Sequence, residues 1–143
     1  MPHETLQPPA AKELLDGKEE WIYLDVRTVE EFQAGHAPGA YNAPVAFRGP
    51  GGMSLNPDFG DVVQRRFPKD AKLVLGCAAG IRSERACEML AELGYENLVN
   101  MDGGFSGRRD QTGNLLVQGW LDCGFETETT CADDHTYAGL GGA

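Results

Sequence analysis

The chain is organised around residues 73–83, which read LVLGCAAGIRS. An apolar run ends at Gly76, and a cysteine, Cys77, is followed by a loop of small residues that leads into a helical pattern from Ser83. This order is typical of a buried strand that delivers a thiol to a loop. The N–H groups of such a loop and the N-terminus of the next helix favour a thiolate or a bound anion. We therefore expect the active site here.

Composition narrows the classes of protein that this chain can represent. Its 143 residues, 41% of them hydrophobic, suit one globular domain with a substantial core. The formal net charge of −10 argues against nucleic-acid binding, which depends on Lys and Arg. No apolar run is long enough to cross a bilayer, so we expect no membrane partner. The first residues, MPHE, show no secretory pattern, which leads us to expect a cytoplasmic location.

Strands and helices are expected to alternate along the chain, which is the pattern of βαβ units. The fold class is therefore α/β, with a central parallel sheet and helices on both of its faces. The first helix is expected to end at Gly17 as a C-terminal glycine. The expected strands cover residues 21–24, 41–43, 73–75 and 98–101, and the expected helices cover residues 8–16, 28–34, 57–67 and 83–93.

Two helix starts carry local signals. Thr28 and Glu31 form the S/T-x-x-E pattern of a capping box. Asn56 and Pro57 read as an N-cap followed by a proline at the first helical position. The stretch before them, residues 44–55, is rich in glycine and proline and is expected to be a loop.

Polar residues and glycines follow three of the predicted strands. Asp25 ends the first, Cys77 follows the central one, and Asp102 with the glycine pair 103–104 follows the last. In parallel sheets of this class, sites lie at the carboxyl ends of the strands. These positions therefore support the loop after residue 76 as the site.

The chain resembles the single-domain rhodanese-like sulfurtransferases, over about residues 14–126. Residues 25–40 contain DVR, EF and GHAPGA and are similar to the first signature of that family. Residues 77–83 are similar to its active-site loop, C-x-x-G-x-R followed by Ser or Thr. The glycine pair 103–104 is the third block. The resemblance implies a single rhodanese-like domain, which we place at residues 5–126, followed by a C-terminal tail at 127–143 that can be mobile.

One region departs from the family pattern. Family members commonly have a tryptophan shortly after the glycine pair, whereas here Phe105 follows it and Trp120 comes much later. We interpret residues 106–119 as an insertion, with a hairpin turn near residues 111–114, that brings Arg108 and Arg109 towards the mouth of the site.

The resemblance and the chemistry of the loop together imply an enzyme. It would move a sulfane sulfur from thiosulfate or a similar donor to a thiol or cyanide, with Cys77 as the covalent carrier in a persulfide. The expected partners are a small sulfur donor and a thiol acceptor, a protein acceptor included, and neither a cofactor nor a metal is expected. The residues expected to bind the substrate, through their N–H groups and the Arg82 side chain, are Ala78, Ala79, Gly80, Ile81, Arg82 and Ser83.

Several charged residues have a structural and a functional interpretation. Asp25, Arg27 and Glu31 are expected to support the site without doing chemistry, with Arg27 pairing with Glu31. Arg82 could instead form an ion pair with a nearby carboxylate. His36 is interpreted as holding a turn by hydrogen bonding, with a general base as the alternative.

The other three cysteines are interpreted as structural or free. Cys87 lies on the apolar face of the helix over 83–93 and is expected in the core. Cys123 and Cys131 are expected to be free thiols near the tail, and the alternatives are a disulfide or resolving thiols. Cys131 with His135 has a loose metal-ligand spacing, but no second pair completes a site.

Two other classes of function compete with sulfur transfer. Phosphatases and arsenate reductases on related folds place five residues between the cysteine and the arginine, whereas four separate Cys77 from Arg82. The smaller loop has fewer amides for a tetrahedral oxyanion and favours a sulfur atom. A non-catalytic binding or regulatory module is the other alternative, and the presence of Cys77 argues against it.

Overall fold

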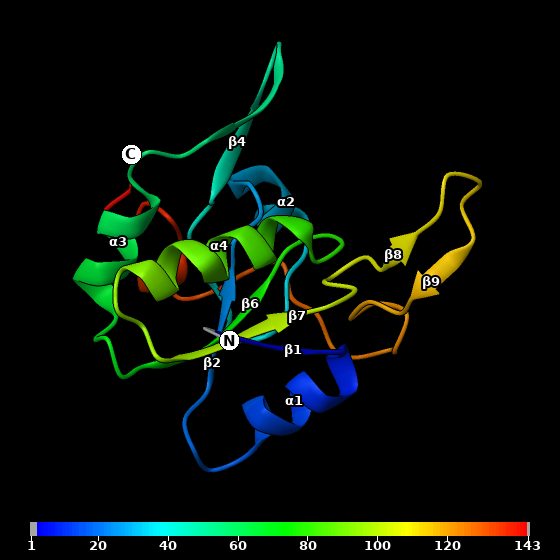
Figure 1. The fold of residues 1–143 in the computed structure, drawn as a ribbon, viewed down its shortest axis with the longest axis horizontal. Coiled ribbons are helices and arrows are strands. Elements are labelled where there is room, and N and C mark those ends of the chain that lie inside the picture. Colours follow the sequence, from blue (N-terminus) through cyan, green and yellow to red (C-terminus); the bar gives the residue numbers. More distant parts are fainter. Residues whose placement is uncertain (1–2, 143) are drawn as a thin grey trace.

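Five parallel strands form the centre of the fold in the computed structural model, which describes residues 3–142 (Figure 1). Their order across the sheet is β1–β7–β6–β2–β3, so the strand before Cys77, β6, is central. The predicted α/β class and parallel sheet are confirmed. The strands are β1 (Glu4–Leu6), β2 (Ile22–Asp25), β3 (Tyr41–Asn42), β6 (Lys72–Gly76) and β7 (Asn97–Met101).

Helices cover both faces of this sheet, as predicted. On one face, α3 and α4 pack over a core that includes Leu73, Leu75 and Cys77. On the other face, α1, Phe32 of α2 and Trp120 form a second core with Val74. No helix within residues 3–142 is long and apolar enough to span a bilayer. The helices are α1 (Pro8–Asp16), α2 (Val29–Ala34), α3 (Phe59–Arg66), α4 (Ile81–Glu92) and the short 3-10 helix η1 (Asp133–His135).

The apolar run of β6 lies in the centre of the sheet because both of its faces are covered. Its three residues Leu73, Val74 and Leu75 are fully buried, as expected for a strand of a parallel sheet. In the register of the sheet, Asp25 lies opposite Gly76, and Leu75 lies opposite Asn100. The ends of β2, β6 and β7 therefore meet beside Cys77.

Two strand-forming regions were not predicted. Residues 44–55, expected as a loop, contain a β-hairpin of β4 (Ala46–Gly49) and β5 (Gly52–Leu55). Most of its residues are exposed, so the sequence shows no alternation of buried and exposed positions. The edge strand β1 is only three residues long and polar, and its pairing with β7 depends on a contact with a segment about 95 positions away in sequence.

Two helix starts and the conformation of one helix-ending glycine differ from the predictions. Helix α3 begins at Phe59, because the Asn56 side chain accepts a hydrogen bond from Asp58 N (3.0 Å) and folds the preceding residues into a turn. Helix α4 begins at Ile81, two residues before the predicted start. Gly17 follows α1 as predicted, but with φ of −79° it is extended rather than left-handed.

Residues 106–119 project from the body of the domain, and the two ends of this segment lie next to each other. They contain the predicted hairpin, β8 (Arg108–Arg109) and β9 (Leu115–Val117), which projects from the body in Figure 1. At its base, Trp120 N donates to Gly104 O (2.8 Å), and the Trp120 ring is buried in the second core. Because the two ends of the excursion meet, these residues have the geometry of an insertion before a core tryptophan.

The segment after Thr127 lies against the domain. Glu128 and His36 exchange two backbone hydrogen bonds of 2.8 and 2.9 Å. Further on, Tyr137 is buried and its hydroxyl accepts a hydrogen bond from the Asn56 amide (2.9 Å). The side chains of residues 127–142 thus contribute to the core over α3 as well as to the surface.

Candidate active site

Cys77 directly follows β6 and is the first residue of the loop that leads to α4. The sulfur of Cys77 accepts a hydrogen bond from this loop. Gly80 N donates to Cys77 Sγ over 3.0 Å, and the side chain is only 1% exposed. Helix α4 begins directly after Gly80. The N–H groups of residues 78, 79, 81 and 82 have no hydrogen-bond acceptor within residues 3–142, as is usual for a helix start. The loop therefore presents donors to a thiolate or an anion.

The glycine pair after β7 closes the loop from the other side. Phe105 N donates to Cys77 O (2.7 Å), and Ser106 N donates to Ala78 O (2.8 Å). Gly104 makes this approach possible: its φ is +55°, and a Cβ there would collide with Cys77 O. The glycine pair 103–104, the third block of the family resemblance, thus allows the backbone of residues 105 and 106 to hold the backbone of Cys77 and Ala78.

Asn100 and Ser83 form a buried polar chain behind the sulfur. Ser83 Oγ lies 3.5 Å from Cys77 Sγ and 2.5 Å from Asn100 Oδ1, and Asn100 Nδ2 donates to Gly80 O (3.3 Å). Ser83 is 0% exposed and Asn100 is 3% exposed. The sequence analysis did not identify Asn100. Its signal was a polar residue within an otherwise apolar strand next to a strand end.

Arg82 forms an ion pair with Glu31 rather than lying free over the loop. Its Nη1 and Nη2 donate to the two Glu31 carboxylate oxygens at 2.8 and 3.1 Å. Glu31 also accepts from Thr28 N, which confirms the predicted capping box of α2. Partial burial alone would raise the pKa of Glu31, but the bonds from Arg82 and Thr28 outweigh it and lower that pKa to about 2. The pair ties the start of α4 to the start of α2.

Arg27 pairs with Asp25, so the predicted pairing with Glu31 is wrong. Arg27 Nε and Nη2 approach the Asp25 carboxylate at 3.0 and 2.7 Å, and Nη2 also donates to Gly35 O (2.7 Å). The guanidinium lies 4.2 Å from the centre of the Phe105 ring. This buried pair joins the end of β2 to the end of α2 beside Phe105, and both of its charged groups are used in these contacts.

His36 holds a turn, as interpreted from the sequence. Its Nδ1 donates to Phe32 O (2.7 Å), and the two rings stack with centroids 3.8 Å apart. The other ring nitrogen, Nε2, lies 3.3 Å from a Glu128 carboxylate oxygen. These contacts attach the C-terminal segment to α2 and involve both ring nitrogens.

The remaining cysteines are free thiols, and their surroundings do not favour the thiolate. Cys87 is buried in the core, and desolvation raises its pKa to about 12. Burial and neighbouring carboxylates also raise the pKa of Cys123 and of Cys131. Within residues 3–142, no group of three or more His, Cys, Asp or Glu side chains is arranged to hold a metal ion.

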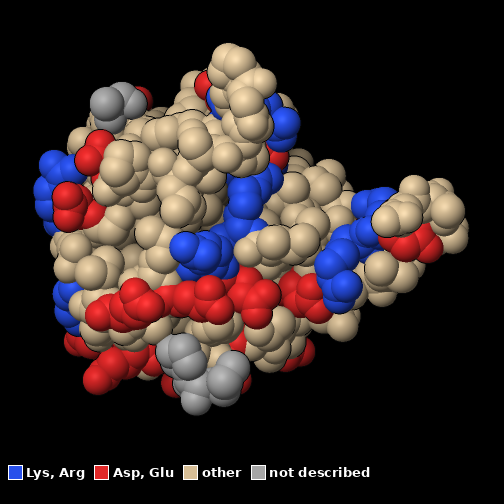
Figure 2. Space-filling view, turned by 45° about the horizontal axis from the view of Figure 1, so that its top comes forward, with Lys and Arg blue, Asp and Glu red and all other residues tan. Residues whose placement is uncertain are grey.

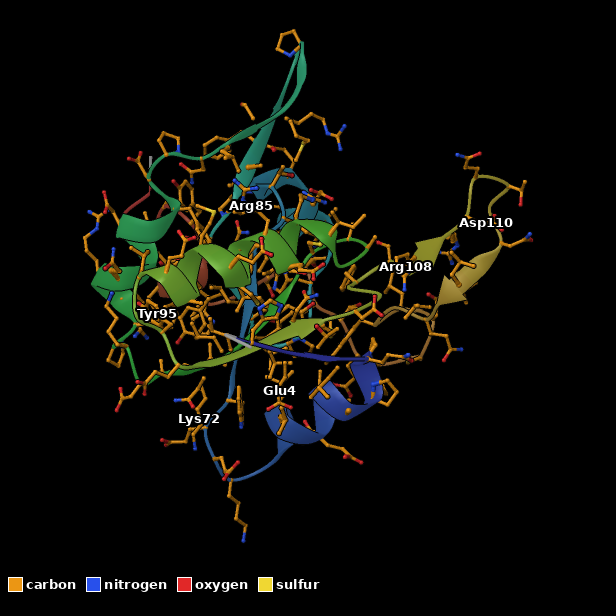
Figure 3. All side chains as sticks on the ribbon, viewed as in Figure 1. Glu4, Lys72, Arg85, Tyr95, Arg108 and Asp110 are labelled. Atoms are coloured by element: carbon orange, nitrogen blue, oxygen red, sulfur yellow. The ribbon has the colours of Figure 1, made fainter. Side chains whose placement is uncertain are left out.

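A small hollow lies beside the loop, between the start of α4 and the base of the β8–β9 hairpin. Its volume is about 360 Å³, and Ala79, Gly80, Asn100 and Arg108 are among its walls. Figure 3 shows Arg108 at this base and Asp110 further out along the hairpin. The predicted position of the insertion next to the site therefore agrees with the structure.

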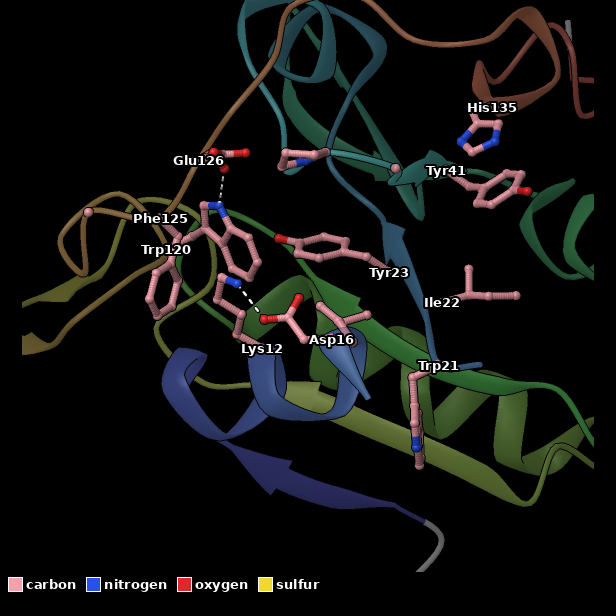
Figure 4. A pocket seen from close by; sticks show the side chains of 14 residues that line it. Lys12, Asp16, Trp21, Ile22, Tyr23, Tyr41, Trp120, Phe125, Glu126 and His135 are labelled. Atoms are coloured by element: carbon pink, nitrogen blue, oxygen red, sulfur yellow. Dashed lines mark hydrogen bonds and ion pairs between the residues drawn. The ribbon is translucent and has the colours of Figure 1, made fainter. Parts of the chain in front are cut away.

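A larger cavity, of about 720 Å³, lies under the other face of the sheet and contains no residue of the loop (Figure 4). Its walls include the aromatic residues Trp21, Tyr23, Trp120 and Phe125. The Tyr23 ring also fills the space above Gly76, and burial raises the pKa of its hydroxyl well above the ordinary value. Because Cys77 does not line this cavity, the loop remains the candidate active site.

Charge is unevenly distributed around the site. In Figure 2, a band of acidic residues crosses one face, and Lys and Arg gather beside that band and on the β8–β9 hairpin. The hairpin carries Arg108, which pairs with Asp102, and Arg109, which pairs with Asp122. Both hairpin arginines are therefore neutralised by carboxylates, and in a chain with a net charge of −10 the loop amides are the main local donors for an anion.

The fold and this site define the class of protein. Residues 7–110 match the rhodanese-like domain family, and the chain belongs to that family. The match ends inside the β8–β9 hairpin, so most of the insertion and the C-terminal segment lie beyond it.

Individual relatives support the same assignment. The chain is 45% identical over 84 residues to thiosulfate sulfurtransferase 16, chloroplastic, of Arabidopsis thaliana, covering 59% of this chain and 70% of the relative. It is 41% identical over 103 residues to the Arabidopsis protein HIGH ARSENIC CONTENT 1, mitochondrial, covering 72% of this chain and 54% of that relative. The crystal structure of Rv0390 from M. tuberculosis has the same fold, with a TM-score of 0.73, 23% identity, and 89% and 98% of the two chains covered.

Proposed function

We propose that this protein is a sulfurtransferase that carries a sulfane sulfur on Cys77. The observation that carries the proposal is the position of the Cys77 sulfur. It lies at the end of the central strand, accepts a hydrogen bond from Gly80 N at 3.0 Å and faces the start of α4. Relatives with 45% and 35% identity are named thiosulfate sulfurtransferases, which supports the same activity.

In the first step, the Cys77 thiolate attacks the outer sulfur of thiosulfate or a similar donor. A bond forms between the two sulfur atoms, the S–S bond of the donor breaks, and sulfite leaves with the bonding electron pair. The N–H groups of residues 78–82 stabilise the negative charge that moves from the thiolate to the persulfide and the leaving anion. The outer sulfur of the persulfide is held about 2 Å from the buried Cys77 sulfur, which is the length of an S–S bond.

In the second step, an acceptor thiolate or cyanide attacks the outer sulfur. The Cys77 sulfur leaves as a thiolate, and the product is a persulfide of the acceptor or thiocyanate. No cofactor is needed, because both steps are displacements at sulfur without net loss of electrons. The acceptors that we propose are small thiols and a protein thiol. A cytoplasmic location stays a prediction.

Mass spectrometry of the intact protein after incubation with thiosulfate tests this function. We expect a gain of one sulfur atom that dithiothreitol removes, and no gain in Cys77→Ser. Formation of thiocyanate from thiosulfate and cyanide should fall at least about 1,000-fold in that variant, because the nucleophile is lost. If no sulfur donor adds mass to the folded wild-type protein, the proposal is wrong.

Arsenate reduction is the second candidate, because a relative with 41% identity carries a name that refers to arsenic. In this reaction Cys77 attacks the arsenic atom of arsenate and water leaves. An external thiol then attacks the Cys77 sulfur, so that a disulfide forms and arsenite leaves with two electrons. Arsenite formed from arsenate and glutathione by the wild-type protein, but not by Cys77→Ser, would favour this activity over sulfur transfer.

A further inference from the structure

The hydroxyl of Ser83 lies between two groups that can each use its single proton. Asn100 Oδ1 is 2.5 Å from Ser83 Oγ, whereas Cys77 Sγ is 3.5 Å away. A hydroxyl donates one hydrogen bond at a time. In the resting structure the shorter contact takes the proton, and Ser83 turns a lone pair towards the sulfur.

The orientation of the Asn100 amide is fixed by its other contact. Nδ2 donates to Gly80 O at 3.3 Å, and the reverse orientation would place two oxygens at that distance. Oδ1 therefore faces Ser83 as an acceptor. Since Cys77, Ser83 and Asn100 are at most 3% exposed, bulk water does not compete for these bonds. Gly80 also donates its N–H to the Cys77 sulfur. Gly80 therefore contacts both Cys77 and Asn100, the two ends of this series of hydrogen bonds.

We propose that Asn100 is a positioning residue that holds the Ser83 proton away from Cys77 until the sulfur leaves as a thiolate. The inference rests on the proposed function, which supplies a step in which the Cys77 sulfur is the leaving group. Before the first step the thiolate has one fewer donor and is the stronger nucleophile. In the second step the Ser83 hydroxyl rotates from Asn100 Oδ1 to the departing sulfur and stabilises its charge. No covalent bond changes at Ser83 or Asn100; a hydrogen bond is exchanged.

Removal of Asn100 should therefore favour the thiolate, but only while Ser83 is present. In Asn100→Ala the hydroxyl has no competing acceptor and donates to Cys77 permanently. A hydrogen bond to the charged form favours it. We expect the pH profile of Cys77 alkylation to move down by about 0.5 to 1 pH unit. Transfer of the outer sulfur to a thiol should become about threefold to tenfold faster, and formation of the persulfide should become slower.

The experiment is a double-mutant cycle of Asn100→Ala and Ser83→Ala. Iodoacetamide labelling of the Cys77 peptide is followed by mass spectrometry between pH 5 and pH 10, on variants whose folding is checked by circular dichroism. Adding Asn100→Ala to Ser83→Ala should leave the profile unchanged. Asn100→Asp, which keeps an acceptor for Ser83, should show no downward shift.

Two results would overturn the inference. An upward shift in Asn100→Ala would mean that the residue acts through the Gly80 N–H. A shift of equal size with and without Ser83 would mean that it acts on the loop as a whole. Alkylation requires no sulfur donor, so these results are independent of whether Cys77 forms a persulfide with thiosulfate. Failure of the proposed function would appear only in the mass measurement after donor treatment.

Discussion

The active-site loop and the β8–β9 hairpin start from neighbouring residues but are held in different ways. The loop is bonded to three other parts of the chain: Phe105 N to Cys77 O, Glu31 to Arg82, and Asn100 to Ser83. The hairpin is held mainly by itself, since the Asp110 carboxylate accepts four bonds within its own turn. The loop is thus held by contacts with residues distant in sequence, whereas the hairpin is held by contacts between residues close in sequence.

This difference separates the chemistry from the surroundings of the site. A change in the loop must disturb a buried network, whereas a change in the hairpin reaches the sulfur only through its base near Asp102 and Arg108. The family match covers the whole loop and ends at residue 110, inside the hairpin. The hairpin can therefore vary in length and sequence while the geometry around Cys77 stays the same.

Gly104→Ala should have the largest effect on stability and activity, because it places a methyl group where the backbone of Gly104 approaches the loop most closely. The new Cβ would collide with Cys77 O at a residue with φ of +55°. We expect a loss of stability of about 2 to 4 kcal/mol. Persulfide formation should fall about 100-fold in the protein that remains folded, because a shift of about 1 Å misplaces the nucleophile. Urea unfolding and the mass measurement with thiosulfate check the two effects.

Gly113→Ala is the matched control in the hairpin. Gly113 also has a positive φ, +90°, but nothing lies within 4 Å of its hypothetical Cβ. The backbone strain should cost about 1 kcal/mol or slightly more in the turn alone and leave persulfide formation unchanged. Equal rates in the two variants would show that the glycine pair does not position the sulfur.

Glu31→Gln should have an intermediate effect that depends on pH. The folded pKa of Glu31, about 2, lies below its ordinary value of 4.5. Its contribution to stability is therefore complete above about pH 4.5 and is lost as the pH falls from there towards 2. The wild type should exceed the variant by about 1 kcal/mol at pH 7, after allowance for solvent screening of this half-buried pair. The difference should be clearly smaller at pH 2.5, and it should vanish only as the pH falls below about 2.

Glutamine keeps the capping position at the start of α2, because its side-chain oxygen can still accept from Thr28 N. The variant thus isolates the charge of the pair with Arg82 from the cap. Urea unfolding at several pH values measures the difference. A gap between wild type and variant that stays constant from pH 7 to pH 2.5 would contradict the lowered pKa.

Structural features that depend only on residues close together in the sequence could be predicted from it. The strand and loop at 73–83 and the capping box of Thr28 and Glu31 are each contained in one short stretch, and the structure has both. The predicted pairing of Arg27 with Glu31 is wrong, although the carboxylates of Asp25 and Glu31 both lie within four residues of Arg27 in sequence. Side chains two residues apart at a strand end project to the same side, so Asp25 is the closer carboxylate.

The rest depends on contacts that no single stretch contains. Asn100 reaches the site only because β7 is paired beside β6, and its partner Ser83 is 17 positions earlier in the chain. The β4–β5 hairpin is exposed on most of its residues, so burial leaves no alternating pattern to read. Strand β1 is recognisable only from its pairing with β7.

The smallest effect is expected for Leu115→Ser combined with Leu116→Ser in β9. These side chains are 42% and 57% exposed and contribute to neither of the two cores. Exposed substitutions away from packed contacts change stability by at most about 0.5 kcal/mol each. The rate of thiocyanate formation from thiosulfate and cyanide should stay within about twofold of the wild type, because both reagents are small and the loop is untouched. A tenfold loss with these reagents would show that the hairpin helps to fix the geometry around Cys77, and the separation between loop and hairpin would not hold.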